Sequence, residues 1–265
     1  MIADNARILR HSVHCAMADM RVIYTWRTWL FAWLSRILTQ VAFFALIGRL
    51  LHSPERTHFL LVGNAVYIVA LVAMQVCASS AWERQAGTLP LLIASPSHPF
   101  VIFVGRSVQW LLDGTACATV SLFALGPVFG VDLPMPRSLL AVPLIALTGV
   151  STYCLGLFLS GFVLRRLESR NLISGVSGLV LMLLCGVQTP TSFWPTPLQY
   201  LADALPLTHG LRAIRHLLDG SSVSLVSADA SLEVCVAAGW LLIAALTFRT
   251  LTEGGRKDGS IEYGD

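Results

Sequence analysis

The chain has few charged residues for its length. Only 12% of its 265 residues are charged, whereas soluble domains carry roughly 25%. Lysine occurs once, at Lys257, so almost all basic residues are arginine. Apolar residues make up 55% of the chain, and the mean hydropathy is +0.70. A large soluble core does not explain so strong a depletion of charge, so the composition indicates a membrane protein.

Several motifs for common chemistry are also missing. No GxxxxGK[ST] phosphate loop occurs, and Lys257 stands in the wrong context, so we do not expect the chain to hydrolyse ATP by itself. HExxH, GxSxG and CxxC patterns are absent as well. His11 and His14 lie three residues apart without further ligands, so we predict no metal site. These absences argue against an enzyme, and we expect no nucleic-acid partner.

Long apolar runs are the main feature that the chain does have. A helix needs about 20 predominantly apolar residues to cross a bilayer. Six runs meet or approach this length and predict an all-α membrane protein with six transmembrane helices. They are residues 29–51, 58–80, 101–129, 138–164, 172–187 and 232–251.

The placement of arginine predicts how these helices are oriented. Cytoplasmic loops carry an excess of basic residues. With the N-terminus in the cytoplasm, the basic residues on or near that side are Arg7, Arg10, Arg21, Arg27, Arg84, Arg106, Arg165, Arg166, Arg170, Arg249, Arg256 and Lys257. Those on the opposite side are Arg49, Arg56, Arg137, Arg212 and Arg215. We therefore expect a multi-pass protein of the plasma membrane with both termini in the cytoplasm.

Three segments outside the long apolar runs have patterns of their own. Residues 1–28 combine apolar residues near helical spacing with arginines, which predicts an amphipathic helix on the membrane surface. Residues 188–231 contain four prolines among apolar residues, so we expect short re-entrant helices, half-buried at the outer surface. Residues 253–265 are rich in glycine and charge, and we expect a disordered cytoplasmic tail.

Two charged residues lie inside predicted spans, and such residues are functional candidates. Arg36 is in the first span and Asp113 in the third. Arg36 could extend to the inner interface while Asp113 accepts a hydrogen bond from a neighbouring hydroxyl. Alternatively, the two could form a pair between helices. An ion-coupled transporter that uses Asp113 is therefore an alternative function.

The segment between the second and third predicted spans is charged and broken by proline. Glu83 and Arg84 are costly in hydrocarbon, and Pro90 and Pro96 interrupt a helix, so this segment does not span. Its leucines would be exposed unless they packed on something. We therefore predict a short amphipathic helix, residues 82–97, that docks a soluble partner. A non-transporting scaffold or immunity protein could use the same surface.

Two sets of residues together resemble a known family. The first set follows the second span and consists of Glu83, Arg84, Gly87, Thr88, Leu89, Leu92, Ser95 and Pro96. The second set precedes the last span and includes Pro190, Phe193, Pro195, Pro206, Leu207 and His209. Both resemble motifs of ABC type-2 exporter permeases, the family of daunorubicin-type drug exporters and of nodulation-factor and polysaccharide exporters. The resemblance covers nearly the whole chain.

The resemblance implies a fold and a set of partners. Residues 1–252 would form the transmembrane domain, paired with a second permease copy that is either identical or different. Separate ABC ATPase subunits would bind ATP and Mg, so this chain would need no cofactor. Residues 82–97 would be the coupling helix in a groove of the ATPase, although Pro90 departs from the family pattern there.

The resemblance also suggests the cargo. The exported molecule would be amphipathic or lipid-like, such as a drug or an antibiotic, which would make antibiotic resistance one outcome of export. A polysaccharide or a lipid-linked glycan is the alternative.

Overall fold

The structure, a computed structural model, describes residues 2–79, 99–165 and 167–258. Helices are the only regular elements in these ranges, which confirms an all-α membrane protein. Five helical stretches in the described residues are long and apolar enough to cross a membrane: Trp26–Leu50, Pro54–Ser79, Phe100–Val128, Arg137–Leu164 and Val223–Leu251. The remaining expected span corresponds to α9 (Arg170–Leu184), which is apolar but shorter. The number six therefore stays a prediction.

Within the described ranges the elements follow one another with short connections. The chain begins with α1 (Ile2–Ile23). The five long stretches contain α2 (Trp26–Thr28) with the π-helix η1 (Trp29–Leu34) and α3 (Ser35–Leu50), then α4 (Pro54–Ala73), α7 (Pro99–Val128), η2 (Arg137–Leu140) with α8 (Ala141–Arg165), and α12 (Val223–Asp258). Shorter helices lie between α8 and α12, namely η3 (Leu167–Ser169), α9, η4 (Thr191–Phe193), α10 (Thr196–Ala204) and α11 (Thr208–Leu218).

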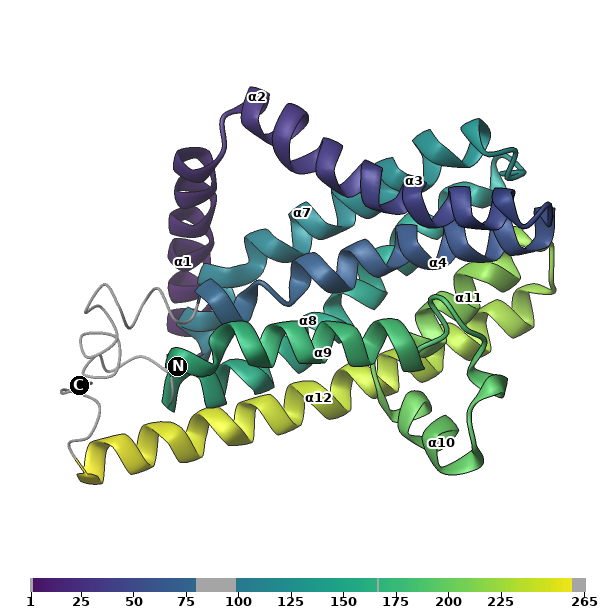
Figure 1. The fold of residues 1–265 in the computed structure, drawn as a ribbon. Coiled ribbons are helices and arrows are strands. Elements are labelled where there is room, and N and C mark those ends of the chain that lie inside the picture. Colours follow the sequence, from purple (N-terminus) through teal and green to yellow (C-terminus); the bar gives the residue numbers. More distant parts are fainter. Residues whose placement is uncertain (1, 80–98, 166, 259–265) are drawn as a thin grey trace.

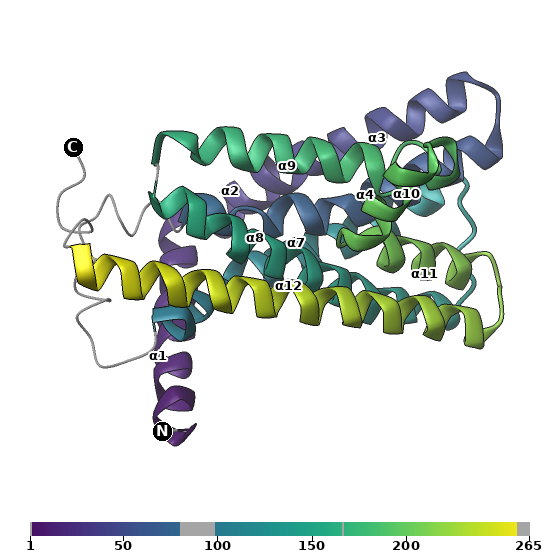
Figure 2. The same cartoon turned by 90° about the horizontal axis from the view of Figure 1, so that it is seen from below.

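The long helices run side by side, and α1 crosses one end of the bundle (Figures 1 and 2). We call this end the α1 end. The start of α7 and the last turns of α12 lie there too. The turn between α11 and α12 lies at the opposite end, together with α10. We call this opposite end the α10 end.

The centre of the bundle is α4. Ser53 caps its first turn by accepting a hydrogen bond from the Arg56 N–H, and Pro54 follows the cap. Every residue from 61 to 70 is buried, because α3, α7 and α8 all pack on this helix. The only strongly polar side chain among them, Asn64, donates to the Leu60 carbonyl oxygen at 2.8 Å. A helix that is apolar on all sides is buried in this way, so α4 positions the other helices.

Two boundaries of α12 differ from those read from hydropathy. The helix begins at Val223, not at residue 232, and so takes in the last residues of the segment 188–231. It also continues to Asp258, where a disordered tail was expected from residue 253. Hydropathy marks the part of a helix that suits hydrocarbon. A helix itself continues beyond that part for as long as its backbone hydrogen bonds are made.

Candidate functional site

The predicted docking segment lies outside the described residues. This applies to Glu83, Arg84, Gly87, Thr88, Leu89, Leu92, Ser95 and Pro96. The structure does place the chain on both sides of it. Val76 and Cys77, after the end of α4, pack in one apolar cluster with Phe100 and Val104 of α7. The described residues that flank the segment, up to residue 79 and from residue 99, therefore both lie at the α1 end.

The N-terminal helix α1 packs closely on α7 at this end. Ser12 is buried, and a Cβ added at Gly105 would lie only 2.4 Å from the Cβ of Ser12. A glycine at position 105 therefore permits the contact. Arg106 adds an ion pair, with its Nη2 3.3 Å from the Asp19 carboxylate. Because both side chains are partly exposed, this pair contributes little stability.

The intramembrane carboxylate Asp113 is bound by two tryptophans. Trp29 Nε1 donates to one of its oxygens at 2.6 Å, and Trp33 Nε1 donates to the other at 2.9 Å. Arg36 is exposed, with its guanidinium carbon 5.4 Å from the centre of the Trp33 ring. The alternative pair of Arg36 with Asp113 does not form. Among the described residues, the donors to Asp113 are the two indoles and the thiol of Cys117, whose Sγ lies 3.6 Å from Oδ1, and no hydroxyl group.

The spacing of the two tryptophans explains this arrangement. Trp29 and Trp33 are four residues apart on η1, so both indoles reach the same side of the helix. π-helical turns of this kind often occur at functional sites. Asp113 lies midway along α7, so its two bonds connect the first long stretch to the third. The sequence gives no sign of the two hydrogen bonds to Asp113, because tryptophan is counted among the apolar residues.

The second predicted set of residues is divided between the surface and the core at the α10 end. Pro190 lines a cavity beside α4, and Phe193 is exposed. Pro195 precedes the first turn of α10. The other three residues, Pro206, Leu207 and His209, are buried around the start of α11. The structure therefore brings only these last three together.

A carboxylate from α12 holds the start of α11. Glu233 is fully buried, and its two oxygens accept hydrogen bonds from the Leu207 N–H at 3.0 Å and the Gly210 N–H at 2.9 Å. The first N–H groups of a helix have no partner within the helix and favour negative charge. Leu207 has a φ of +85°, which is uncommon for a residue with a side chain. The chain turns sharply at Leu207, and Glu233 caps the helix that follows.

Side chains and backbone from three neighbouring elements close this junction. Thr208 Oγ1 donates to the Ala202 carbonyl oxygen, and His209 Nε2 lies 3.0 Å from the Asp203 carbonyl oxygen. A Cβ added at Gly210 would lie 2.1 Å from Thr148 Oγ1 on α8, so only glycine fits. The motif before the last span therefore encodes a sharp turn and a close helix contact.

Charged side chains link α10, α11 and α12. Arg212 of α11 contacts Asp203 of α10 at 3.1 Å and Asp229 of α12 at 3.8 Å. His216 of α11 lies 2.9 Å from the other carboxylate oxygen of Asp229. Pairs this exposed contribute modestly to stability. Their arrangement nevertheless fixes three helices relative to one another at the α10 end.

Glu233 is not among the functional residues predicted from the sequence. The signal was present, because Glu233 is the second residue of the predicted sixth span and a charge there is a functional candidate. Its partners lie 26 and 23 residues earlier and are backbone N–H groups. Backbone donors leave no mark in a sequence, so only the folded chain shows what Glu233 binds.

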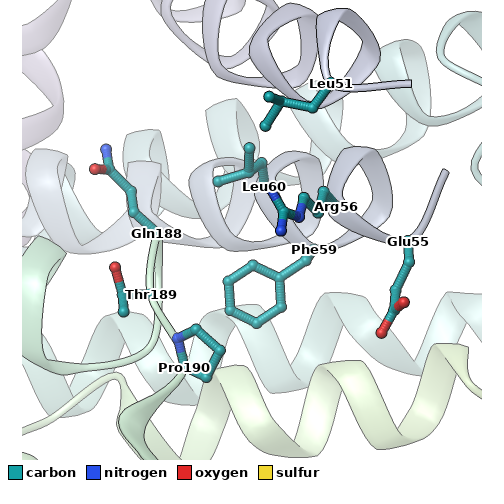
Figure 3. Close-up of a pocket in the computed structure, with 8 residues that line it drawn as sticks. All are labelled: Leu51, Glu55, Arg56, Phe59, Leu60, Gln188, Thr189 and Pro190. Carbon is teal, nitrogen blue, oxygen red and sulfur yellow. The ribbon is translucent and has the colours of Figure 1, made fainter. Parts of the chain in front are cut away.

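A cavity of about 550 Å³ lies at the α10 end (Figure 3). Phe59 and Leu60, from the first turns of α4, form one side of it. The loop of residues 188–190, after α9, forms the other side. The charged residues Glu55 and Arg56 also line the cavity, and both are exposed. A volume of this size can hold a small molecule.

Comparison with known proteins identifies the family. The sequence model of the ABC-2 type transporter family matches residues 14–218, from within α1 to the end of α11. The match covers most of the chain and includes both motif segments, which confirms the resemblance at the level of the family. No curated protein matches the chain. The chain belongs to the ABC-2 type transporter family.

Proposed function

We propose that this chain is the permease subunit of an exporter that moves an amphipathic or lipid-like compound, such as a drug or an antibiotic, out of the cell. Membership of the family makes the chain a multi-pass membrane component of an ABC transporter, and such components normally work with an ABC ATPase. In our proposal a separate ATPase supplies the energy, and a second permease copy completes the path.

The α1 end carries the proposal, because it gathers the parts that an ATPase would contact. The chain on both sides of the docking segment lies there, and α1 packs on the start of α7. Arg7 and Arg10 are exposed on α1. Under the positive-inside rule this end faces the cytoplasm. A push on residues 82–97 would then act directly on the ends of α4 and α7.

The alternatives differ in what they would require. In an ion-coupled transporter, Asp113 would need to exchange its hydrogen-bond partners during transport. Both carboxylate oxygens of Asp113 accept hydrogen bonds from indole N–H groups, which favours a structural role for this residue. Transport that Asp113→Asn abolishes, with normal assembly and no dependence on an ATPase, would favour ion coupling.

A polysaccharide or lipid-linked glycan exporter would keep the same ATPase arrangement with another cargo. A scaffold or immunity protein would bind its partner without any flux.

The test is co-purification of the ATPase from mild detergent. Tagged permease should retain a soluble nucleotide-binding subunit in stoichiometric amount. Glu83→Lys should reduce the retained ATPase by about tenfold or more, because an acidic contact becomes repulsive. Glu168→Lys is the matched control, since Glu168 is an exposed acidic residue of η3 outside the docking segment. A permease that purifies alone, or equal loss in both variants, would contradict the proposal.

A further inference from the structure

The cavity at the α10 end has the size and the lining of a binding site. Its volume of about 550 Å³ suits a ligand or a large part of one. Leu51, Phe59 and Leu60 supply apolar surface, and Gln188 and Thr189 supply hydrogen-bonding groups. Apolar surface combined with a few polar groups is typical of pockets that bind small molecules.

The two charged side chains of the lining, Glu55 and Arg56, point in different directions. In Figure 3 the Arg56 guanidinium points toward Phe59 and Leu60, whereas the Glu55 carboxylate points away from Gln188 and Thr189. Among the described residues, no carboxylate forms an ion pair with Arg56. Arg56 therefore offers a free guanidinium beside the apolar side of the cavity.

A second arginine supports the cavity wall. The Arg215 guanidinium carbon lies 3.6 Å from the centre of the Phe59 ring, and its Nη2 donates to the Phe59 carbonyl oxygen at 3.1 Å. These contacts fix the aromatic wall. Burial lowers the pKa of Arg215 to about 9, and the Asp219 carboxylate opposes this shift, so the side chain is still charged at neutral pH. Two positive charges therefore lie close to Phe59, one at the lining and one behind the ring.

We infer that this cavity binds an anionic amphiphile. A phosphate or carboxylate head would bind Arg56, whose planar guanidinium matches such groups with two parallel hydrogen bonds. Gln188 and Thr189 would bind the remaining oxygens of the head. The apolar chain of the ligand would lie on Phe59 and Leu60. This inference narrows the substrate class of the proposed exporter and depends on the proposed function only in that respect, since binding itself needs no ATPase.

The experiment measures binding to the permease alone. The full chain is placed in nanodiscs of phosphatidylcholine, and radiolabelled dodecyl phosphate is titrated by scintillation proximity, with empty discs subtracted. We expect saturable binding that Arg56→Gln weakens by about tenfold or more, because a charge-assisted contact is lost. Thr189→Val should weaken binding by about threefold through loss of a neutral hydrogen bond.

Two controls identify the cause of any loss. Arg49→Gln removes the same charge from the exposed last turn of α3, at the same end but outside the cavity lining, and should leave binding unchanged. Dodecyltrimethylammonium, with the same chain and a positive head, should fail to compete. Competition by this cation, absence of saturable binding, or equal loss in Arg49→Gln and Arg56→Gln would overturn the inference.

A further measurement distinguishes two sources of the ligand, a membrane lipid and a freely exchanging amphiphile. The titration is repeated with phosphatidylglycerol in the disc, to measure whether this lipid displaces dodecyl phosphate. Displacement identifies a membrane lipid as the natural occupant, and lack of displacement identifies a freely exchanging amphiphile; both support an anionic site. Because the ATPase is absent from every arm, loss of ATPase coupling would overturn the proposed function without touching this result.

Discussion

At the scale of single residues, Glu233 joins the last long helix to the start of α11. A buried carboxylate that accepts two backbone N–H bonds is expensive to remove, since both donors then lose their partner inside the protein. The positive φ of Leu207 would then lack the contact that stabilises it. Stability at this junction therefore depends strongly on the Glu233 side chain.

We expect Glu233→Ala to lower the free energy of unfolding by about 2–4 kcal/mol, because two buried donors are left unpaired. Thermal unfolding in detergent micelles, followed by fluorescence-detected size exclusion, would show the loss as a lower midpoint. Glu233→Gln keeps one acceptor oxygen and should lie between wild type and Glu233→Ala. Wild-type midpoints for both variants would show that Glu233 does not cap α11.

The contact between Gly210 and Thr148 allows a second test at the same scale. Gly210→Ala would place a Cβ 2.1 Å from Thr148 Oγ1, and overpacking of this kind costs about 1–3 kcal/mol. Adding Thr148→Ala should restore part of the lost stability, because the closest atom on that side chain would then be its Cβ, at 3.1 Å. Strictly additive effects of the two changes in the same unfolding assay would contradict a direct contact.

At the scale of elements, the docking of α1 on α7 depends on close approach at Gly105. A Cβ there would meet Ser12, so Gly105→Val should push α1 away from the bundle. We expect the yield of a short bismaleimide cross-link between Asp19→Cys and Arg106→Cys, in a Cys15→Ser background, to fall by roughly half or more.

Gly239→Val is the control for that prediction. A Cβ at Gly239 of α12 has no neighbour within 4 Å, so the same substitution there should leave the cross-link intact. An unchanged yield in Gly105→Val would mean that α1 does not need this close contact.

The first and third long stretches are joined differently, through Trp29, Trp33 and Asp113. Here a polar bond between two helices takes the place of small residues in close contact. In hydrocarbon such a bond has no water to compete with it, although measured values for similar bonds are modest, on the order of 1 kcal/mol. Its main effect is to set the rotation of η1 relative to α7.

At the scale of the whole molecule, the two ends of the bundle should face opposite sides of the membrane. We expect a membrane-impermeant maleimide to label Cys15, which is exposed on α1, only after the cells are permeabilised. Asp132→Cys, exposed at the α10 end between α7 and η2, should be labelled in intact cells. Cys235→Ser is included in both variants, and Cys15→Ser in the second. The reverse pattern would invert the proposed orientation.

The sequence by itself determined the class of the protein and most of its long helices. Apolar runs of spanning length and the scarcity of charge are local properties, so they predicted an all-α membrane protein and gave the middle of each helix, although not the ends of α12. The two motif segments likewise indicated the family, because a family pattern consists of residues that lie close together in the chain.

Only the tertiary structure decided which groups meet. Asp113 could have bound Arg36, a hydroxyl group or an indole, and the rotation of η1 selected two indoles. Glu233 and Arg215 bind backbone groups of distant segments, and the cavity lies between a helix start and a loop more than one hundred residues away. Backbone donors and acceptors are the same at every residue, so no sequence pattern marks the one that a side chain binds.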